Sequence, residues 1–304
     1  MSSGSAGHVT RSTGRPEYET AGRGPARTFL RTADGVPVDA AYTPGRGTSE
    51  TAPDGLAVVV AHGFTGDLER PHVRRAADAF AQYGAVVTFS FRGHGASGGH
   101  STVGDREVLD LDAAVRWARE LGHTRVATVG FSMGGSVVLR QAAARDAAVV
   151  AEHRGRTEAR TEAHAGALTA TTVDAVVAVS APARWYYRGT APMRRLHWLV
   201  TRPMGRAVGR YGLRTRIHHR DWDPVPASPV ESVPLIAPTP LLIVHGDRDG
   251  YFPLDHPRML AEAAGDGAEL WLEHGMGHAE NAADDALLHR IGHWTAAHTA
   301  AHTG

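Results

Sequence analysis

The chain has 304 residues, of which 42% are hydrophobic and 21% charged, a balance typical of a protein with a large packed core. Its 32 basic residues, all arginine, equal its 32 acidic residues, so no net charge draws the whole molecule to nucleic acid or to an anionic membrane. Cysteine is absent, which excludes disulfides, thiolate metal sites and a cysteine nucleophile.

Residues 1–25 are rich in Ser, Gly, Thr and Arg and hold almost no large apolar side chain, so we expect a disordered tail. They lack the apolar core of about 7 to 15 residues found in signal peptides, and no apolar run reaches the ~20 residues needed to span a bilayer. We therefore expect no membrane span and a cytoplasmic location.

Eight short apolar runs bounded by turn residues follow the tail, and the valine-rich runs are typical of buried strands. They are residues 27–31, 36–42, 56–62, 85–91, 125–129, 175–180, 240–245 and 269–272. Helical patterns lie between most of them, as in residues 107–121. This alternation predicts an α/β fold, with a mostly parallel eight-stranded sheet covered by helices on both faces and with binding sites at the carboxyl ends of the strands.

Two segments interrupt the alternation. Residues 151–172 repeat the sequence Arg-Thr-Glu-Ala and hold few large apolar side chains, so we expect a helix extension that continues into a mobile surface loop. Residues 183–238, between the sixth and seventh strands, hold six aromatic residues and are expected to form a small helical cap. The core would then comprise residues 26–182 and 239–304.

The predicted cap carries ten arginines against three acidic residues. This positive charge could attract acidic or phosphate-bearing substrates, or it could simply lie in solvent. The aromatic side chains leave a similar choice, because they could line an apolar acyl pocket or pack the interior of the cap. The residues predicted to line a substrate pocket are Thr65, Trp185, Tyr186, Trp198 and Phe252.

A candidate nucleophile lies in Gly-Phe-Ser-Met-Gly, residues 130–134. The motif stands between a predicted strand, 125–129, and a predicted helix, 134–147. Small residues around a sharp strand-to-helix turn place the serine hydroxyl above the sheet, where it can attack a substrate. The position predicts that Ser132 is a nucleophile that forms an acyl-enzyme.

A serine hydroxyl needs a general base, which in this arrangement follows an orienting carboxylate along the chain. His278 lies on a glycine-flanked loop after the last predicted strand, before a helix expected from about Asn281 to Ala300, and is the candidate base. Asp247 and Asp249 both follow the seventh strand. One of them could orient the imidazole, while the other could cap the turn.

Acyl transfer also needs donors for the oxyanion of the tetrahedral intermediate, and backbone N–H groups usually supply them. The residue after the nucleophile, Met133, is one candidate donor. Phe64, on the loop after the third strand, is the other. On the same loop, we expect His62 to be structural through its ring hydrogen bonds, and Thr65 could add a hydroxyl.

Residues 93–98 match the glycine pattern of dinucleotide-binding turns, but such turns open directly into a helix. Here the helix is delayed to about Arg106, so neither a nicotinamide nor a flavin is expected. No His-Glu-x-x-His motif and no clustered carboxylates appear in the sequence. We therefore expect no metal and no cofactor.

Five motifs, HGFTG, FRGHGASGG, GFSMGG, HGDRDGYFP and GMGH, appear in the order seen in α/β-hydrolases. Over residues 28–299, apart from 151–172, the chain resembles the feruloyl or cinnamoyl esterase and monoacylglycerol-lipase-like group. The resemblance implies an α/β-hydrolase fold and hydrolysis of carboxylic esters without a cofactor, and it favours Asp249 over Asp247 as the orienting acid. The substrate does not carry over, because the cap is the least similar part.

Other functions use the same three residues. A thioesterase, an acyltransferase or a perhydrolase would keep Ser132 and change the bond or the acceptor. A ligand-binding protein without catalysis is a further alternative, although it would not need three groups in register. In each case the expected partner is a small-molecule ester or other acyl compound and not nucleic acid, while a homo-oligomer remains open.

Overall fold

The computed structural model describes residues 24–47, 55–153 and 170–300. The predicted tail, residues 1–25, therefore lies almost entirely outside the described residues. Most of the predicted mobile segment, residues 151–172, also lies outside them, although the helix before it continues to His153.

Eight strands form a single sheet in the order β1-β2-β4-β3-β5-β6-β7-β8, and all neighbours from β4 to β8 are parallel. The β1–β2 and β2–β4 pairs are antiparallel. The strands are β1 (Ala26–Arg31), β2 (Pro37–Thr43), β3 (Leu56–Ala61), β4 (Ala85–Phe89), β5 (Arg125–Phe131), β6 (Ala175–Val179), β7 (Leu241–Gly246) and β8 (Ala268–Glu273). The predicted mostly parallel sheet is confirmed.

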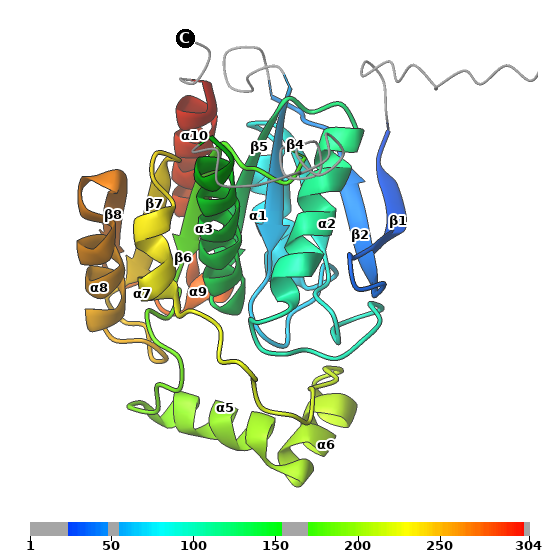
Figure 1. The fold of residues 1–304 in the computed structure, drawn as a ribbon, viewed down its shortest axis with the longest axis vertical. Helices are drawn as coiled ribbons and strands as arrows, with labels where there is room; N and C mark the ends of the chain where they lie inside the picture. The colour runs from blue at the N-terminus through cyan, green and yellow to red at the C-terminus, as the bar shows by residue number, and fades with distance from the viewer. Residues whose placement is uncertain (1–23, 48–54, 154–169, 301–304) are drawn as a thin grey trace, which may run out of the picture.

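Helices cover both faces of the sheet (Figure 1). On one face lie α1 (Pro71–Phe80) and α10 (Asp285–Ala300), and on the other lie α2 (Glu107–Glu120), α3 (Met133–His153) and α8 (Asp255–Ala264). Strand β3 shows how two cores form: Val58 and Val60 pack in the first, and Val59 packs in the second. Because side chains alternate along a strand, a continuous apolar run can bury both faces.

The chain after His278 differs from the prediction of one helix over about 281–300. Two helices form instead, α9 (Ala279–Ala282) and α10. Ala283 is extended, and the Asp284 side chain accepts a hydrogen bond from the N–H of Leu287, 2.8 Å away. An aspartate in this position satisfies a free N–H at a helix start, so Asp284 begins a new helix rather than continuing the first.

We call residues 183–238 the cap segment. Its helices α5 (Ala191–Thr201) and α6 (Pro203–Gly212) lie below the sheet in Figure 1, at the end opposite the C-terminus. The residue between them, Arg202, is extended because it precedes Pro203, and this separates the two helices.

The end of the cap segment returns to the core. It holds α7 (Pro229–Ser232) and a 3-10 turn, Val233–Leu235, and Val233 and Ile236 pack in the same core as α3. A second 3-10 turn, Gly265–Gly267, precedes β8. Within the described ranges, no helix combines the length and the apolar character needed to cross a membrane.

Candidate active site

Ser132 stands alone between the end of β5 and the start of α3, with a φ of 51°. A Cβ on Gly130 would overlap the carbonyl of Gly134, and a Cβ on Gly134 would overlap the carbonyl of Ala61. Only glycine fits at both flanking positions, because the turn packs directly against neighbouring backbone. The local sequence therefore produces the sharp turn and leaves the serine side chain half-buried beside a cavity.

Three predicted residues from three separate loops form one hydrogen-bonded chain. The Nε2 atom of His278 lies 2.9 Å from Oγ of Ser132, and its Nδ1 atom lies 2.7 Å from Oδ2 of Asp249. Since an ionised carboxylate only accepts hydrogen bonds, Nδ1 carries the proton and Nε2 is left to accept the serine O–H. The Asp249 side chain has no exposed surface, whereas that of His278 is 16% exposed.

The carboxylate of Asp249 is stabilised in its charged form. Its second oxygen accepts from the backbone N–H groups of Tyr251 and Phe252, at 2.8 and 3.1 Å. Burial is the strongest influence and opposes ionisation, but the hydrogen bond and charge of His278, with the Phe252 N–H, keep the pKa of Asp249 below its ordinary value. Asp249 is therefore an anion at neutral pH.

Asp247, the competing carboxylate, has different partners. It accepts from the N–H of Gly275 and from Nδ1 of His274, both at 2.7 Å. The Gly275 hydrogen bond is the main reason why the pKa of Asp247 is lowered. Asp247 thus connects the loop after β7 to the loop after β8 by hydrogen bonds. The carboxylate that contacts His278 is that of Asp249.

The loop that holds Asp249 contains a further histidine that the sequence did not single out. His245, at the end of β7, is buried, and its Nε2 donates to the carbonyl of Phe252 at 2.8 Å, 3.6 Å from Oδ2 of Asp249. Burial lowers the pKa of His245, which keeps it neutral. On the same loop Tyr251 stacks on His278, with ring centroids 4.2 Å apart, so the imidazole is held from two sides.

A loop after β3 presents one free amide toward the nucleophile. The N–H of Gly63 donates to Glu280 at 3.0 Å, and the N–H of Thr65 donates to Nε2 of His94 at 3.2 Å. Between them, the N–H of Phe64 has no acceptor among the residues that the structure describes. Met133 is the first residue of α3, and a first helical N–H has no acceptor within its helix. Both predicted donors line the same cavity as Ser132.

Two neutral histidines support this loop. His62 donates from Nδ1 to the carbonyl of Gly63 at 2.7 Å and accepts at Nε2 from the N–H of Phe91 at 3.0 Å. Complete burial lowers the pKa of His62 to about 3, with a contribution from the nearby His94. Burial also lowers the pKa of His94, which donates from Nδ1 to the carbonyl of Arg92. The expected structural role of His62 matches these bonds, whereas the sequence reasoning missed His94, within the glycine-rich motif.

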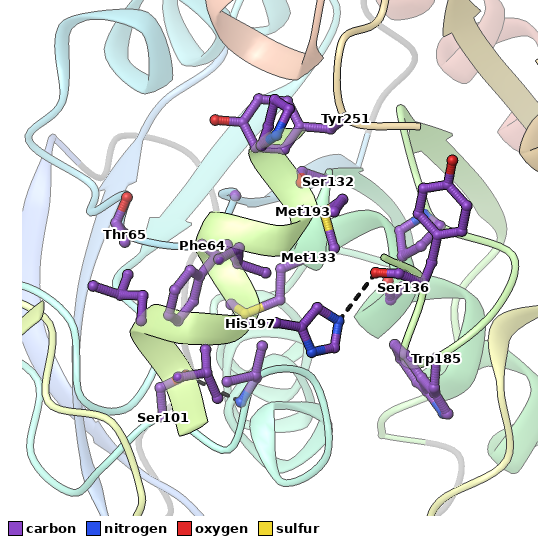
Figure 2. A pocket seen from close by; sticks show the side chains of 18 of the residues that line it. Phe64, Thr65, Ser101, Ser132, Met133, Ser136, Trp185, Met193, His197 and Tyr251 are labelled. Atoms are coloured by element: carbon purple, nitrogen blue, oxygen red, sulfur yellow. Dashed lines mark hydrogen bonds between the residues drawn. The ribbon is translucent and has the colours of Figure 1, made fainter. Parts of the chain in front are cut away.

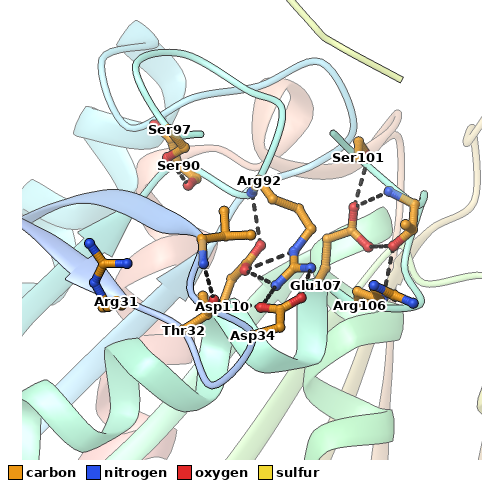
Figure 3. Close-up of polar contacts among 12 residues, drawn as sticks. Arg31, Thr32, Asp34, Ser90, Arg92, Ser97, Ser101, Arg106, Glu107 and Asp110 are labelled. Atoms are coloured by element: carbon orange, nitrogen blue, oxygen red, sulfur yellow. Dashed lines mark hydrogen bonds and ion pairs between the residues drawn. The ribbon is translucent and has the colours of Figure 1, made fainter. Parts of the chain in front are cut away.

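The segment that carries His94 is anchored by buried ion pairs (Figure 3). The guanidinium of Arg92 donates to Asp110 on α2 at 2.8 and 2.9 Å and to Asp34 at 2.8 and 3.0 Å. The hydrogen bond from Arg92 is the main reason why the pKa of Asp34 falls to about 2. Further along, Glu107 accepts from the hydroxyl and N–H groups of the loop that leads to α2.

Glu280 is another residue that the sequence reasoning missed. Its side chain is only 4% exposed, it lies two residues after His278, and His72 is 3.8 Å away. A Cβ on Gly63 would come within 3.2 Å of its carboxylate. Glu280 therefore links the loop of the candidate base to the loop of the candidate oxyanion donor. Its contact with Gly63, 217 residues away in the sequence, arises from folding and has no local sequence signal.

The cavity beside Ser132 has a volume of about 1160 Å³ and extends from the sheet to the cap segment (Figure 2). All five residues predicted to line a substrate pocket contribute to its wall: Thr65, Trp185, Tyr186, Trp198 and Phe252. Tyr186 and Trp198 are 56% and 47% exposed, so these two do not form a packed interior of the cap. Across the described ranges, no group of three or more His, Asp or Glu side chains could hold a metal ion.

Several solved structures share this fold. The chain is similar to the esterase Pf2001 of Pyrococcus furiosus, with 21% identity, a TM-score of 0.58, and coverage of 91% of this chain and 90% of that one. It is also similar to the α/β hydrolase GrgF of Penicillium sp. sh18, with 18% identity, a TM-score of 0.61, and coverage of 91% of this chain and 99% of that one. A third similar structure is Est1E of Butyrivibrio proteoclasticus, with 17% identity, a TM-score of 0.54, and coverage of 90% of this chain and 99% of that one. Est1E has also been solved with ferulic acid bound.

No curated protein has significant sequence similarity to the chain. Residues 58–289, however, match the model of the alpha/beta hydrolase family, and this range covers most of the chain and the parallel part of the sheet apart from the first two residues of β3. The sheet order, the strand-to-helix turn at Ser132 and the family match agree. The chain belongs to the alpha/beta hydrolase family.

Proposed function

We propose that this protein is a serine hydrolase that cleaves carboxylic esters of small molecules through an acyl-enzyme on Ser132. The observation that carries the proposal is the chain from Ser132 to His278 to Asp249, with distances of 2.9 and 2.7 Å, at the wall of a large cavity. The similarity to solved structures described as esterases favours esters over other acyl compounds. A thioesterase, an acyltransferase or a perhydrolase would use the same residues.

In the first step, Nε2 of His278 accepts the hydroxyl proton of Ser132 while Oγ attacks the ester carbonyl. The carbonyl oxygen becomes an oxyanion, and the N–H groups of Phe64 and Met133 donate hydrogen bonds to it. His278 then gives the proton to the departing alcohol, and the acyl group stays on Ser132. Throughout, Asp249 stabilises the imidazolium and holds its orientation.

In the second step, a water molecule attacks the acyl-enzyme and gives a proton to His278. The same two amides stabilise the second oxyanion. Collapse of this intermediate returns the proton from His278 to Oγ of Ser132 and releases the carboxylic acid. Over the two steps, one ester and one water molecule become one alcohol and one carboxylic acid, and the protein returns to its starting state.

Substitution of the nucleophile tests the proposal. We expect Ser132→Ala to lower kcat for p-nitrophenyl esters by at least about 10⁴-fold and to abolish labelling by a fluorophosphonate. Ser136→Ala is a matched control, because Ser136 lies one turn further along α3, lines the same cavity, and its hydroxyl has no hydrogen-bond partner within the described part of the chain. Labelling that persists in Ser132→Ala would show that another residue is the nucleophile.

A panel of matched oxygen esters and thioesters with the same acyl groups separates the related activities. Faster turnover of oxygen esters is expected. A preference for thioesters, or transfer to an added alcohol or amine in place of water, would replace ester hydrolysis while leaving Ser132 as the nucleophile. Tight ligand binding without any turnover or labelling would favour a protein that only binds.

A further inference from the structure

The cap segment differs in charge from the rest of the chain. Ten arginines against three acidic residues give it a formal charge of +7, and because the whole chain is neutral the remainder carries −7. The use of arginine in place of lysine applies to the entire chain and does not explain this imbalance, since acidic residues are also scarce in the cap segment. The positive charge is therefore a local property of the cap segment.

Four of these arginines line the cavity that contains Ser132. Arg184 and Arg188 lie on the loop between β6 and α5, Arg195 lies on α5, and Arg220 lies on the loop after α6. Two acidic residues also line the cavity. One, Glu280, already accepts the N–H of Gly63, which leaves Asp221 as the acidic residue near the arginines.

The cap arginines differ in the partners of their side chains. Arg194, Arg206 and Arg216, which do not line the cavity, donate to backbone carbonyls. The guanidinium groups of three cavity arginines have no acceptor within the described residues: Arg188, Arg195 and Arg220. The same holds for Arg202, Arg210 and Arg214, which do not line the cavity. The fourth cavity arginine, Arg184, is paired with Asp255 at 2.8 Å. Three arginines without a side-chain acceptor among the described residues therefore line the cavity.

Apolar side chains line the same cavity as these cations. Met193, Leu196 and Leu199 on α5 line the cavity, as does Met133 beside the nucleophile. The volume of about 1160 Å³ slightly exceeds that of most ligand pockets, which commonly have about 300 to 1,000 Å³. Such a cavity suits a substrate with a sizeable apolar part as well as a charged group.

We propose that the natural substrate is an acyl compound with an apolar body and an anionic group, a carboxylate or a phosphate, that binds Arg188, Arg195 and Arg220. This inference rests on the proposed function of Ser132 and adds the substrate class. A planar guanidinium donates two parallel hydrogen bonds to a carboxylate or phosphate. Single exposed ion pairs contribute little, but several cations around one hollow raise the local concentration of an anion.

Two pairs of substrates test where the charge lies. Mono-p-nitrophenyl esters of dicarboxylic acids, with about 6 to 14 carbons, place a carboxylate on the acyl side, and p-nitrophenyl esters of the monocarboxylic acids are the neutral counterparts. Acyl-coenzyme A places phosphates on the leaving group, and the N-acetylcysteamine thioester of the same acid is its neutral counterpart. In at least one pair we expect kcat/KM to favour the anionic member by about tenfold or more at low salt.

Two triple variants locate the effect within the cap segment. The cavity variant is Arg188→Gln, Arg195→Gln and Arg220→Gln. The control variant is Arg202→Gln, Arg210→Gln and Arg214→Gln, which removes the same charge from exposed positions that do not line the cavity. The cavity variant should reduce the preference to about twofold or less and keep activity on the neutral ester, while the control should retain most of the preference. In the wild type, the preference should shrink as salt screens it.

Equal kcat/KM for the anionic and neutral members of both pairs would overturn this inference, and so would an equal loss of preference in the two triple variants. In either case, hydrolysis and fluorophosphonate labelling would persist and the proposed function would stand. If the wild type hydrolyses none of the substrates and Ser132 is not labelled, the proposed function fails, and the substrate class fails with it.

Discussion

On the sheet side of the cavity, the side chains around Ser132 are buried and hydrogen-bonded, whereas the cap side is open and has few buried residues. Asp249 accepts from three donors, and Glu280 and His94 hold the amides on either side of Phe64. Along α5, by contrast, Met193 is the one buried residue, and Trp198 is 47% exposed.

The difference indicates a division of roles between the two sides. Acyl transfer requires reacting atoms to be held within a fraction of an ångström, which buried and fully bonded side chains achieve. Substrate selection tolerates looser packing, and a segment with few buried contacts can change its lining residues at little cost in stability. Substitutions on the sheet side should therefore affect kcat or stability, and those on the cap side should affect KM and substrate preference.

The largest effect is expected from the buried carboxylate. Asp249→Asn should lower kcat by about 10³- to 10⁴-fold, because an amide cannot hold the imidazole in the required tautomer or stabilise its charge. Asp247→Asn is the matched control, since Asp247 bonds His274 and Gly275 and not His278, and its kcat should stay within about threefold. The reverse order of effects in steady-state kinetics would assign the orienting role to Asp247.

The second effect concerns stability and pH. His62 is neutral in the folded protein, with a pKa near 3, but its ordinary pKa is 6.5. Below pH 6.5 the unfolded chain therefore binds a proton that the folded chain excludes, and His62 lowers the free energy of unfolding by about 1.4 kcal/mol per pH unit until about pH 3. Above pH 6.5 it has no such effect. Urea denaturation between pH 7 and about pH 5 measures the slope.

His62→Asn should reduce the slope of the free energy of unfolding against pH by the contribution of about one proton, which is about 1.4 kcal/mol per pH unit. This holds whatever the effect of the substitution on stability at pH 7. The comparison of slopes is informative even if the variant is less stable, because other buried histidines, such as His256, contribute equally to both proteins. An identical slope in the two proteins would mean that His62 titrates normally in the folded state.

A smaller effect is expected from Glu280, which links the loops of His278 and Phe64. Glu280→Ala should lower kcat about tenfold with little change in KM, because the freed Gly63 N–H would let the Phe64 amide move away from the oxyanion. Glu280→Gln keeps an acceptor at the same place and should recover most of the activity. Glu262→Ala, at an exposed position on α8, controls for loss of a glutamate. A rise in KM with kcat unchanged would instead place Glu280 in substrate binding.

The smallest effect is expected in the cap segment. Trp198→Ala should change the free energy of unfolding by less than about 0.5 kcal/mol, since the side chain is about half exposed. It should raise KM for long-chain esters several-fold and leave short-chain esters nearly unaffected, because Trp198 lines the cavity from α5 in the cap segment, whereas Ser132 lies at the end of β5 in the sheet. A large loss of stability would show that the tryptophan packs the cap, which is the other role considered from the sequence.

Much of the candidate active site could be predicted because its signals are local. The turn at Ser132 depends on Gly130 and Gly134, which are close in sequence, and strand β5 and helix α3 adjoin it directly. The alternation of strands and helices predicted the fold for the same reason. The single long helix predicted after His278 was wrong because the capping side chain of Asp284 outweighs a continuous helical pattern.

Taken alone, the sequence determined the order of strands and helices, the strand-to-helix turn at Ser132 and the loops on which Phe64, Asp249 and His278 lie. The tertiary structure decided which atoms meet. Asp247 and Asp249 are two residues apart, and each is 2.7 Å from a histidine, but only Asp249 reaches the one beside Ser132. Such pairings depend on how loops that are far apart in the sequence pack together. Neither the propensity of a residue nor the periodicity of a segment encodes which of these loops come into contact.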